Sequence, residues 1–136
     1  MISVPHEDLR ILLEVGYLYL GMQKFKEAGE VFEGVMVLTP NSEVPIVALG
    51  NVFCVQGKFE QAIKMYHKAL EVEPKSAFAT AYLGEAMFFK GDKEKAQETL
   101  NQASKMDPQG KSGDFARALL DLIKKGFTPD LSQLKK

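Results

Sequence analysis

Few side chains in this sequence are of the types that carry out catalysis or hold a metal ion. The two histidines, His6 and His67, have no partners at the spacing of metal ligands, and the single cysteine, Cys54, cannot complete a zinc site alone. Cys54 stands at a position that suits an apolar side chain, so we expect a buried, inert thiol. His67 stands at a polar position and is expected on the outer surface. No metal site is predicted.

A short glycine-lysine-serine run at 110–112 resembles the end of a phosphate-binding loop. The first glycine of that motif would have to stand at residue 105, which is Lys105, and no strand precedes the run. The sequence also offers no set of side chains that could act together as general acid, general base and nucleophile. We therefore predict a protein that is not an enzyme and that needs no cofactor.

The composition indicates one soluble domain without a general affinity for nucleic acid or lipid. The chain has 136 residues, 46% of them hydrophobic, and a net charge of −1. A single cysteine permits no intrachain disulfide, which fits a reducing compartment. The N-terminus lacks the pattern of a signal peptide, and the longest nearly uncharged run, 44–57, is too short to span a bilayer. We expect a cytoplasmic protein.

The elements that would position a functional side chain come from a repeat of 34 residues. The positions related by this step are Gly16, Gly50 and Gly84; Ala28, Ala62 and Ala96; Pro40, Pro74 and Pro108; Val15, Leu49 and Leu83; Tyr19, Phe53 and Met87; and Phe32, Tyr66 and Leu100. A fixed period of this length is typical of stacked units, none of which can bury its apolar face alone. Glycine inside a helix costs about 1 kcal/mol against alanine, so the recurring glycines predict close approach between helices.

Apolar residues at helical spacing predict two helices in each unit. The expected helices cover about 5–22, 25–38, 44–56, 59–72, 77–90 and 93–106, and a further helix covers 115–125 after a cap at Asp114. We predict a single domain over 1–136, with repeats at about 9–42, 43–76 and 77–110, a capping helix at about 114–125 and a partly disordered tail at 127–136.

The middle unit resembles the tetratricopeptide repeat. The residues that carry the resemblance are Leu49-Gly50, Phe53, Ala62, Tyr66, Ala69 and Pro74. With the other two units it covers about residues 9–125. The resemblance implies an all-α fold in which three helix pairs form a right-handed superhelix with a C-terminal capping helix. It also implies that the first helix of each pair lines a concave groove.

A second apolar stripe in the third unit points to a function for this groove. Phe78, Tyr82, Glu85 and Phe89 share one helix face that the repeat does not require. The matching residues of the second unit are smaller and partly polar: Val44, Ala48, Asn51 and Val55. Such a groove suits an amphipathic helix or an extended apolar segment.

The predicted partner-binding residues come from these faces in all three units. They are Leu13, Tyr17, Val44, Val47, Ala48, Asn51, Val55, Phe78, Ala81, Tyr82, Glu85 and Phe89. Among them, we expect Asn51 to hold a backbone amide of the partner and Glu85 to hold a basic side chain.

Other interpretations of the same positions stay open. Val44, Val47 and Ala81 could be ordinary packing residues between repeats. The groove could be filled by Leu131 and Leu134 of the tail, or two copies could pack together as a homodimer.

One class of tetratricopeptide-repeat protein is not supported. Members that grip a C-terminal carboxylate use Lys, Asn and Arg in the groove. The corresponding positions here are Leu13, Tyr17, Ala48, Phe78 and Tyr82, none of which is a cation.

Three repeats, a cap and an apolar groove resemble the tetratricopeptide-repeat chaperones of bacterial type III secretion systems. The chain length is closer to the chaperones of the needle subunit than to those of the pore-forming translocators. The resemblance implies a bacterial cytoplasmic protein that sequesters an amphipathic helix of a secreted subunit, expected to be the needle subunit, beside a small helical co-chaperone. The alternatives are a translocator chaperone and a general scaffold or assembly adaptor. Neither nucleic acid nor membrane insertion is expected.

Overall fold

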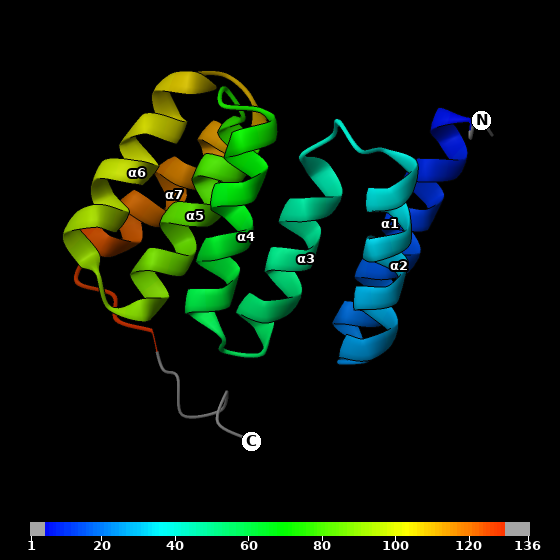
Figure 1. Cartoon of the computed structure of the whole chain (residues 1–136). Coiled ribbons are helices and arrows are strands. Elements are labelled where there is room, and N and C mark those ends of the chain that lie inside the picture. The colour runs from blue at the N-terminus through cyan, green and yellow to red at the C-terminus, as the bar shows by residue number, and fades with distance from the viewer. Residues whose placement is uncertain (1–4, 130–136) are drawn as a thin grey trace.

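The structure, a computed structural model, describes residues 5–129, and every regular element in this range is a helix (Figure 1). The helices are α1 (His6–Gly21), α2 (Phe25–Leu38), α3 (Val44–Val55), α4 (Phe59–Val72), α5 (Ala77–Lys90), α6 (Lys93–Met106) and α7 (Lys111–Lys124). The predicted all-α class is confirmed. None of these helices is long and apolar enough to cross a membrane.

The helices pair in sequence order, and the pairs stack side by side from α1 and α2 at one end to α7 at the other (Figure 1). Contacts also link α1 to α3, α3 to α5 and α5 to α7. Within the described range, the even-numbered helices have no contacts of comparable extent with one another. The odd-numbered helices therefore lie closer together, and the stack curves so that they form its inner side.

Glycines allow the two helices of each pair to approach closely. A side chain at Gly50 would place its Cβ 2.5 Å from the Tyr66 ring, and one at Gly84 would place its Cβ 2.7 Å from Leu100. The first pair has an equivalent contact at the matching position. Tyr66 and Leu100 are fully buried. The prediction that the repeated glycines mark close helix–helix contact is confirmed.

The capping helix begins earlier than the sequence predicts. It starts at Lys111 rather than after a cap at Asp114. The contact that supports the first turn comes from Asp107, at the end of α6, whose Oδ2 accepts a hydrogen bond from the Gly113 amide at 3.2 Å. A side chain at Gly113 would collide with the Asp107 carbonyl oxygen, so glycine is required there. This contact between two helices has no signature in the local sequence.

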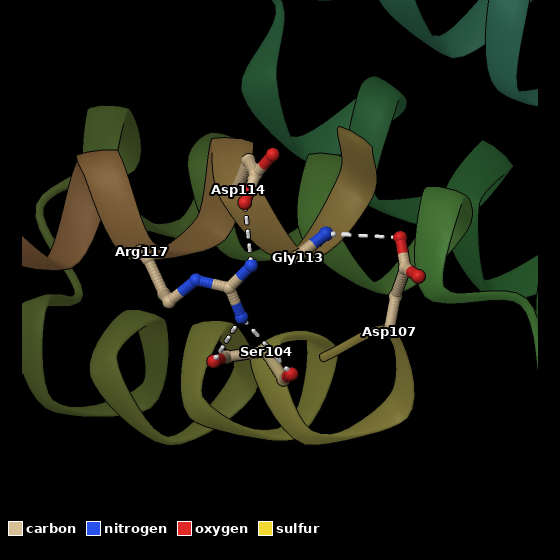
Figure 2. A network of polar contacts seen from close by, with 5 residues as sticks. All are labelled: Ser104, Asp107, Gly113, Asp114 and Arg117. Carbon is tan, nitrogen blue, oxygen red and sulfur yellow. Dashed lines mark hydrogen bonds and ion pairs between the residues drawn. The ribbon is translucent and has the colours of Figure 1, made fainter. Parts of the chain in front are cut away.

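Arg117 fixes α7 against α6 from the next turn (Figure 2). Its guanidinium donates to Ser104 Oγ at 3.1 Å and to the Ser104 carbonyl oxygen at 3.4 Å. It also pairs with Asp114 Oδ1 on its own helix at 2.6 Å. The end of the stack is therefore closed by polar contacts as well as by the buried apolar face of α7.

We predict opposite effects of alanine at two helical glycines. Gly50→Ala should lower the free energy of unfolding by about 2 kcal/mol, because the new methyl group meets the Tyr66 ring. Gly34 lies in the interior of α2, and a Cβ atom added there would have no other atom within 4 Å. Gly34→Ala should therefore raise the free energy of unfolding by about 0.5–1 kcal/mol, because alanine has the higher helix propensity. Urea unfolding of both variants measures the difference. Equal effects of the two substitutions would contradict the close-approach interpretation.

Candidate functional site

The candidate site lies on the inner side of the stack, where α5 carries an aromatic face. Ser76 Oγ accepts a hydrogen bond from the Ala79 amide at 3.0 Å and so caps α5, which places Phe78 in its first turn. The ring of Tyr82, one turn later, lies 5.2 Å from the Phe78 ring and 5.2 Å from the ring of Phe115 on α7. All three rings are only partly buried. We call Phe78, Tyr82 and Phe115 the aromatic cluster.

A chain of hydrogen bonds joins the first helix pair to the second beside this cluster. Asn51 Nδ2 donates to the Tyr17 hydroxyl at 3.1 Å, and the Tyr66 hydroxyl donates to Asn51 Oδ1 at 2.5 Å. Loss of solvent around the hydroxyl groups raises the pKa of Tyr17 to about 12 and raises the pKa of Tyr66 as well. Both hydroxyls therefore keep their protons at neutral pH, and the chain holds α1, α3 and α4 in register.

Glu85 is the charged residue next to this network. It is only partly exposed, and within residues 5–129 it forms no ion pair and no side-chain hydrogen bond. Burial raises the pKa of its carboxyl to about 7. Its negative charge in turn raises the pKa values of Tyr66, Tyr82 and Cys54.

The two residues whose chemistry the sequence predicts lie as expected. Cys54 is partly buried, and burial followed by the charge of Glu85 raises its pKa to about 12, so the thiol is protonated and unreactive. His67 is exposed on α4, on the outer side of the stack. Among the described residues, no three histidine, cysteine, aspartate or glutamate side chains gather closely enough to hold a metal ion.

Four residues of the predicted partner-binding set are corrected by the structure. Val47 and Ala48 are 0% exposed and Ala81 is 1% exposed, because they pack between neighbouring helices. We assign these three to the core, as the packing alternative predicts for Val47 and Ala81. Asn51 was expected to hold a backbone amide of the partner, but it is buried at 7% exposure and its amide group bonds to Tyr17 and Tyr66.

The remaining predicted residues keep some exposed surface. Leu13, Val44, Phe78, Tyr82, Glu85 and Phe89 are partly buried, and Tyr17 and Val55 are exposed. Phe89 uses part of its surface internally, since its ring stacks on Phe59 at 5.7 Å. Leu131 and Leu134, the alternative occupants of the groove, lie outside the described residues.

Leu13 and Val44 line a hollow near the N-terminal end of the stack. It has a volume of about 350 Å³ and lies between α1, α3 and the loop that precedes α3. The other residues that line it are His6, Leu9, Arg10, Val35, Thr39, Ser42 and Pro45. No residue of the aromatic cluster lines this hollow.

Two residues of the site are missed by the sequence analysis. Phe115 belongs to the apolar stripe of the capping helix, which has no repeat partner to compare with, so nothing marks it as facing Tyr82. Tyr66 is assigned to the repeated core, but its counterparts Phe32 and Leu100 lack a hydroxyl. That difference is the signal that could have placed Tyr66 in a polar network.

The arrangement of the helices can be compared with known proteins. Residues 56–120 match the family model described as tetratricopeptide repeat. The chain has the tetratricopeptide-repeat fold. No curated protein matches the sequence significantly. The chain is therefore compared with solved structures, which share little sequence identity with it.

Two of the similar structures are translocator chaperones of type III secretion. SycD of Yersinia enterocolitica has a TM-score of 0.74 at 18% identity, covering 86% of this chain and 90% of SycD. PcrH of Pseudomonas aeruginosa has a TM-score of 0.73 at 18% identity, covering 89% of this chain and 95% of PcrH. A third similar structure is the first tetratricopeptide-repeat domain of Spaghetti (RPAP3) bound to an HSP90 peptide. It has a TM-score of 0.71 at 21% identity, covering 93% of this chain and 98% of that domain. These likenesses establish the fold.

We predict that Glu85 makes the stability of the chain depend on pH. Its pKa is about 7 in the folded state and 4.5 ordinarily, so the folded state keeps a proton that the unfolded state releases between these values. The resulting stabilisation, at most about 3 kcal/mol, is present in full below about pH 4.5 and is lost as the pH rises through about 7.

Urea unfolding across this pH range measures the effect. Glu85→Gln removes the titrating group, so it should flatten the profile and make the variant more stable than the wild type at about pH 8. Glu98→Gln, at an exposed position on α6, is the control and should keep the wild-type profile. A Glu85→Gln profile that still falls between these pH values would assign the dependence to another group.

Proposed function

We propose that this chain is a chaperone that uses its inner groove to hold an apolar segment of a type III secretion translocator before export. The observation that carries the proposal is the aromatic cluster. The rings of Phe78 and Phe115 both contact the ring of Tyr82, yet all three rings keep exposed surface. The repeat does not require Phe78 or Tyr82 for stacking, so their retained exposed surface is best explained by a partner.

The shape of the groove suits an apolar chain segment with a few polar anchors. Aromatic side chains bury a large apolar area on binding at a low cost in conformational entropy, because each has few rotatable bonds. The hydrogen-bond chain through Asn51 holds the first and second helix pairs together, so the groove is formed in advance of binding. A preformed apolar groove is the usual receptor for an amphipathic helix or an extended segment.

The partners of the similar structures support a translocator as the substrate. SycD has been solved with a peptide of the translocator YopD, and PcrH with the chaperone binding regions of PopB and PopD. The needle-subunit substrate expected from chain length has no support among these structures. Of the alternatives given by the sequence, the translocator chaperone fits best.

Self-association is a second candidate, favoured by a different surface. Large apolar side chains are exposed on the first pair of helices, with Leu18 at 66% and Val37 at 81%. The two residues lie on the neighbouring helices α1 and α2, where contact with a second copy of the chain would cover them. Light scattering over a range of concentrations would detect a dimer, and substituting Leu18 with Gln should abolish it without changing partner binding in the groove.

We predict that polar substitution in the aromatic cluster abolishes partner binding. The double variant Phe78→Gln and Tyr82→Gln should leave a co-expressed partner insoluble, because two of the three exposed rings are removed. The partners to test are the secreted proteins encoded beside the gene. The control is Val37→Gln, an apolar-to-polar change on α2, which should retain the partner in the soluble complex.

Circular dichroism must show the same helical content for both variants. The proposal fails if the double variant keeps every partner as soluble as the wild type does. It also fails if the wild type solubilises none of these secreted proteins.

A further inference from the structure

We propose that the groove contains a subsite for a basic side chain, in which Glu85 pairs with a lysine or arginine of the bound segment beside the ring of Tyr82. This inference rests on the proposed function and adds a requirement to it. The partner segment must carry a positive charge among its apolar residues, at a fixed distance from those that meet the aromatic cluster.

The first argument is the absence of a positive charge around Glu85. Glu85 forms no ion pair within residues 5–129, and the groups whose pKa values its charge raises are the Cys54 thiol of α3, the Tyr66 hydroxyl of α4 and the Tyr82 hydroxyl on its own helix. Tyr17 of α1 stands one step further away, behind the hydrogen bonds of Asn51. All of these are neutral at pH 7, and the neighbour that α7 contributes to the cluster, Phe115, carries no charge.

The second argument is that the carboxylate keeps contact with solvent. No fully buried side-chain oxygen or nitrogen in the described part of the chain lacks a hydrogen-bond partner. Since Glu85 forms no hydrogen bond there, its oxygens must keep contact with solvent. A half-buried carboxylate that is open to solvent but unpaired is poorly compensated, so a cation from the partner would stabilise its charged form.

The third argument is the position of the rings. Glu85 and Tyr82 lie one turn apart on the same face of α5, and Tyr82 touches Phe78 and Phe115. A lysine or arginine has an aliphatic stem that can lie on such rings while its charged end reaches the carboxylate. The unpaired charge and the aromatic cluster therefore form one surface of matched chemistry for a basic side chain.

The pairing predicts a dependence on pH that apolar contact alone does not give. A cation binds the ionised form of Glu85, and a carboxyl with a pKa of about 7 is mostly protonated at about pH 6. A basic peptide should therefore bind the wild type about tenfold more weakly at about pH 6 than at about pH 8. The Glu85→Gln variant should show no such change.

The test begins with a random-peptide phage library selected on the wild-type protein, with the Phe78→Gln and Tyr82→Gln double variant as counter-selection. Peptides that depend on the groove should be enriched in lysine or arginine. One such peptide is then synthesised in two forms, with its lysine and with methionine in that place. Fluorescence anisotropy gives Kd for both forms with the wild type, Glu85→Gln and the control Glu98→Gln.

The expected result is specific to Glu85. Exchange of lysine for methionine should weaken binding at least about tenfold for the wild type and for Glu98→Gln, and have little effect for Glu85→Gln. The subsite is refuted, while the proposed function stands, if groove-dependent peptides carry no basic residue. It is also refuted if the exchange of lysine for methionine weakens binding to Glu85→Gln as much as binding to the wild type. If no peptide depends on the aromatic cluster, both are refuted.

Discussion

The contact between Gly50 and Tyr66 is the constraint on which the rest of the structure depends. With no Cβ at Gly50, the ring of Tyr66 packs against the backbone of α3 and is fully buried between the helices of the second pair. Its hydroxyl then reaches Asn51 and continues through Asn51 to Tyr17 on the first pair. One close approach therefore fixes the distance within a pair and also the relation between two pairs. A stack built in this way has a rigid inner side.

Tyr66 is also one of the groups whose pKa is raised by the charge of Glu85. Tyr66, Tyr82 and Cys54 surround Glu85 with groups that stay protonated at neutral pH, and none of them offsets its charge. The carboxylate is held half-buried because α5 packs directly on α3 and α4. Its raised pKa therefore follows from the repeat geometry. In the proposed function, the apolar rings provide affinity for the partner and the unpaired acid provides a means of selection.

Sequence periodicity predicted most of the fold because the repeated positions are those that each pair needs for its own packing. Gly50 and Tyr66 could be recognised from their copies at the same step. The start of α7 could not be predicted, since it depends on Asp107, which directly follows α6. A capping helix has no copy elsewhere in the chain, so the 34-residue comparison gave no information about it.

The site was predictable only in part, because its contacts join different helices. A helix inside a stack has neighbours on several sides, so spacing alone could not separate the packing residues Val47 and Ala81 from the exposed rings of Phe78 and Tyr82. Residue size was a partial guide, because Phe78, Tyr82 and Phe89 kept exposed surface whereas Val47, Ala48 and Ala81 did not. Asn51 was wrongly assigned to the partner, because the sequence does not reveal its hydrogen bonds to Tyr17 and Tyr66 on other helices. Such partners appear only when the helices are placed in space.

The central claim is that a partner segment lies on the inner side of the stack. Site-specific photo-crosslinking tests it most directly, with p-benzoylphenylalanine incorporated in place of Phe78 in the groove or in place of His67 on the exposed outer side of α4. With a secreted partner co-expressed, the account predicts a crosslinked complex from position 78 and none from position 67. Crosslinking from position 67 alone, or equally from both positions, would contradict it.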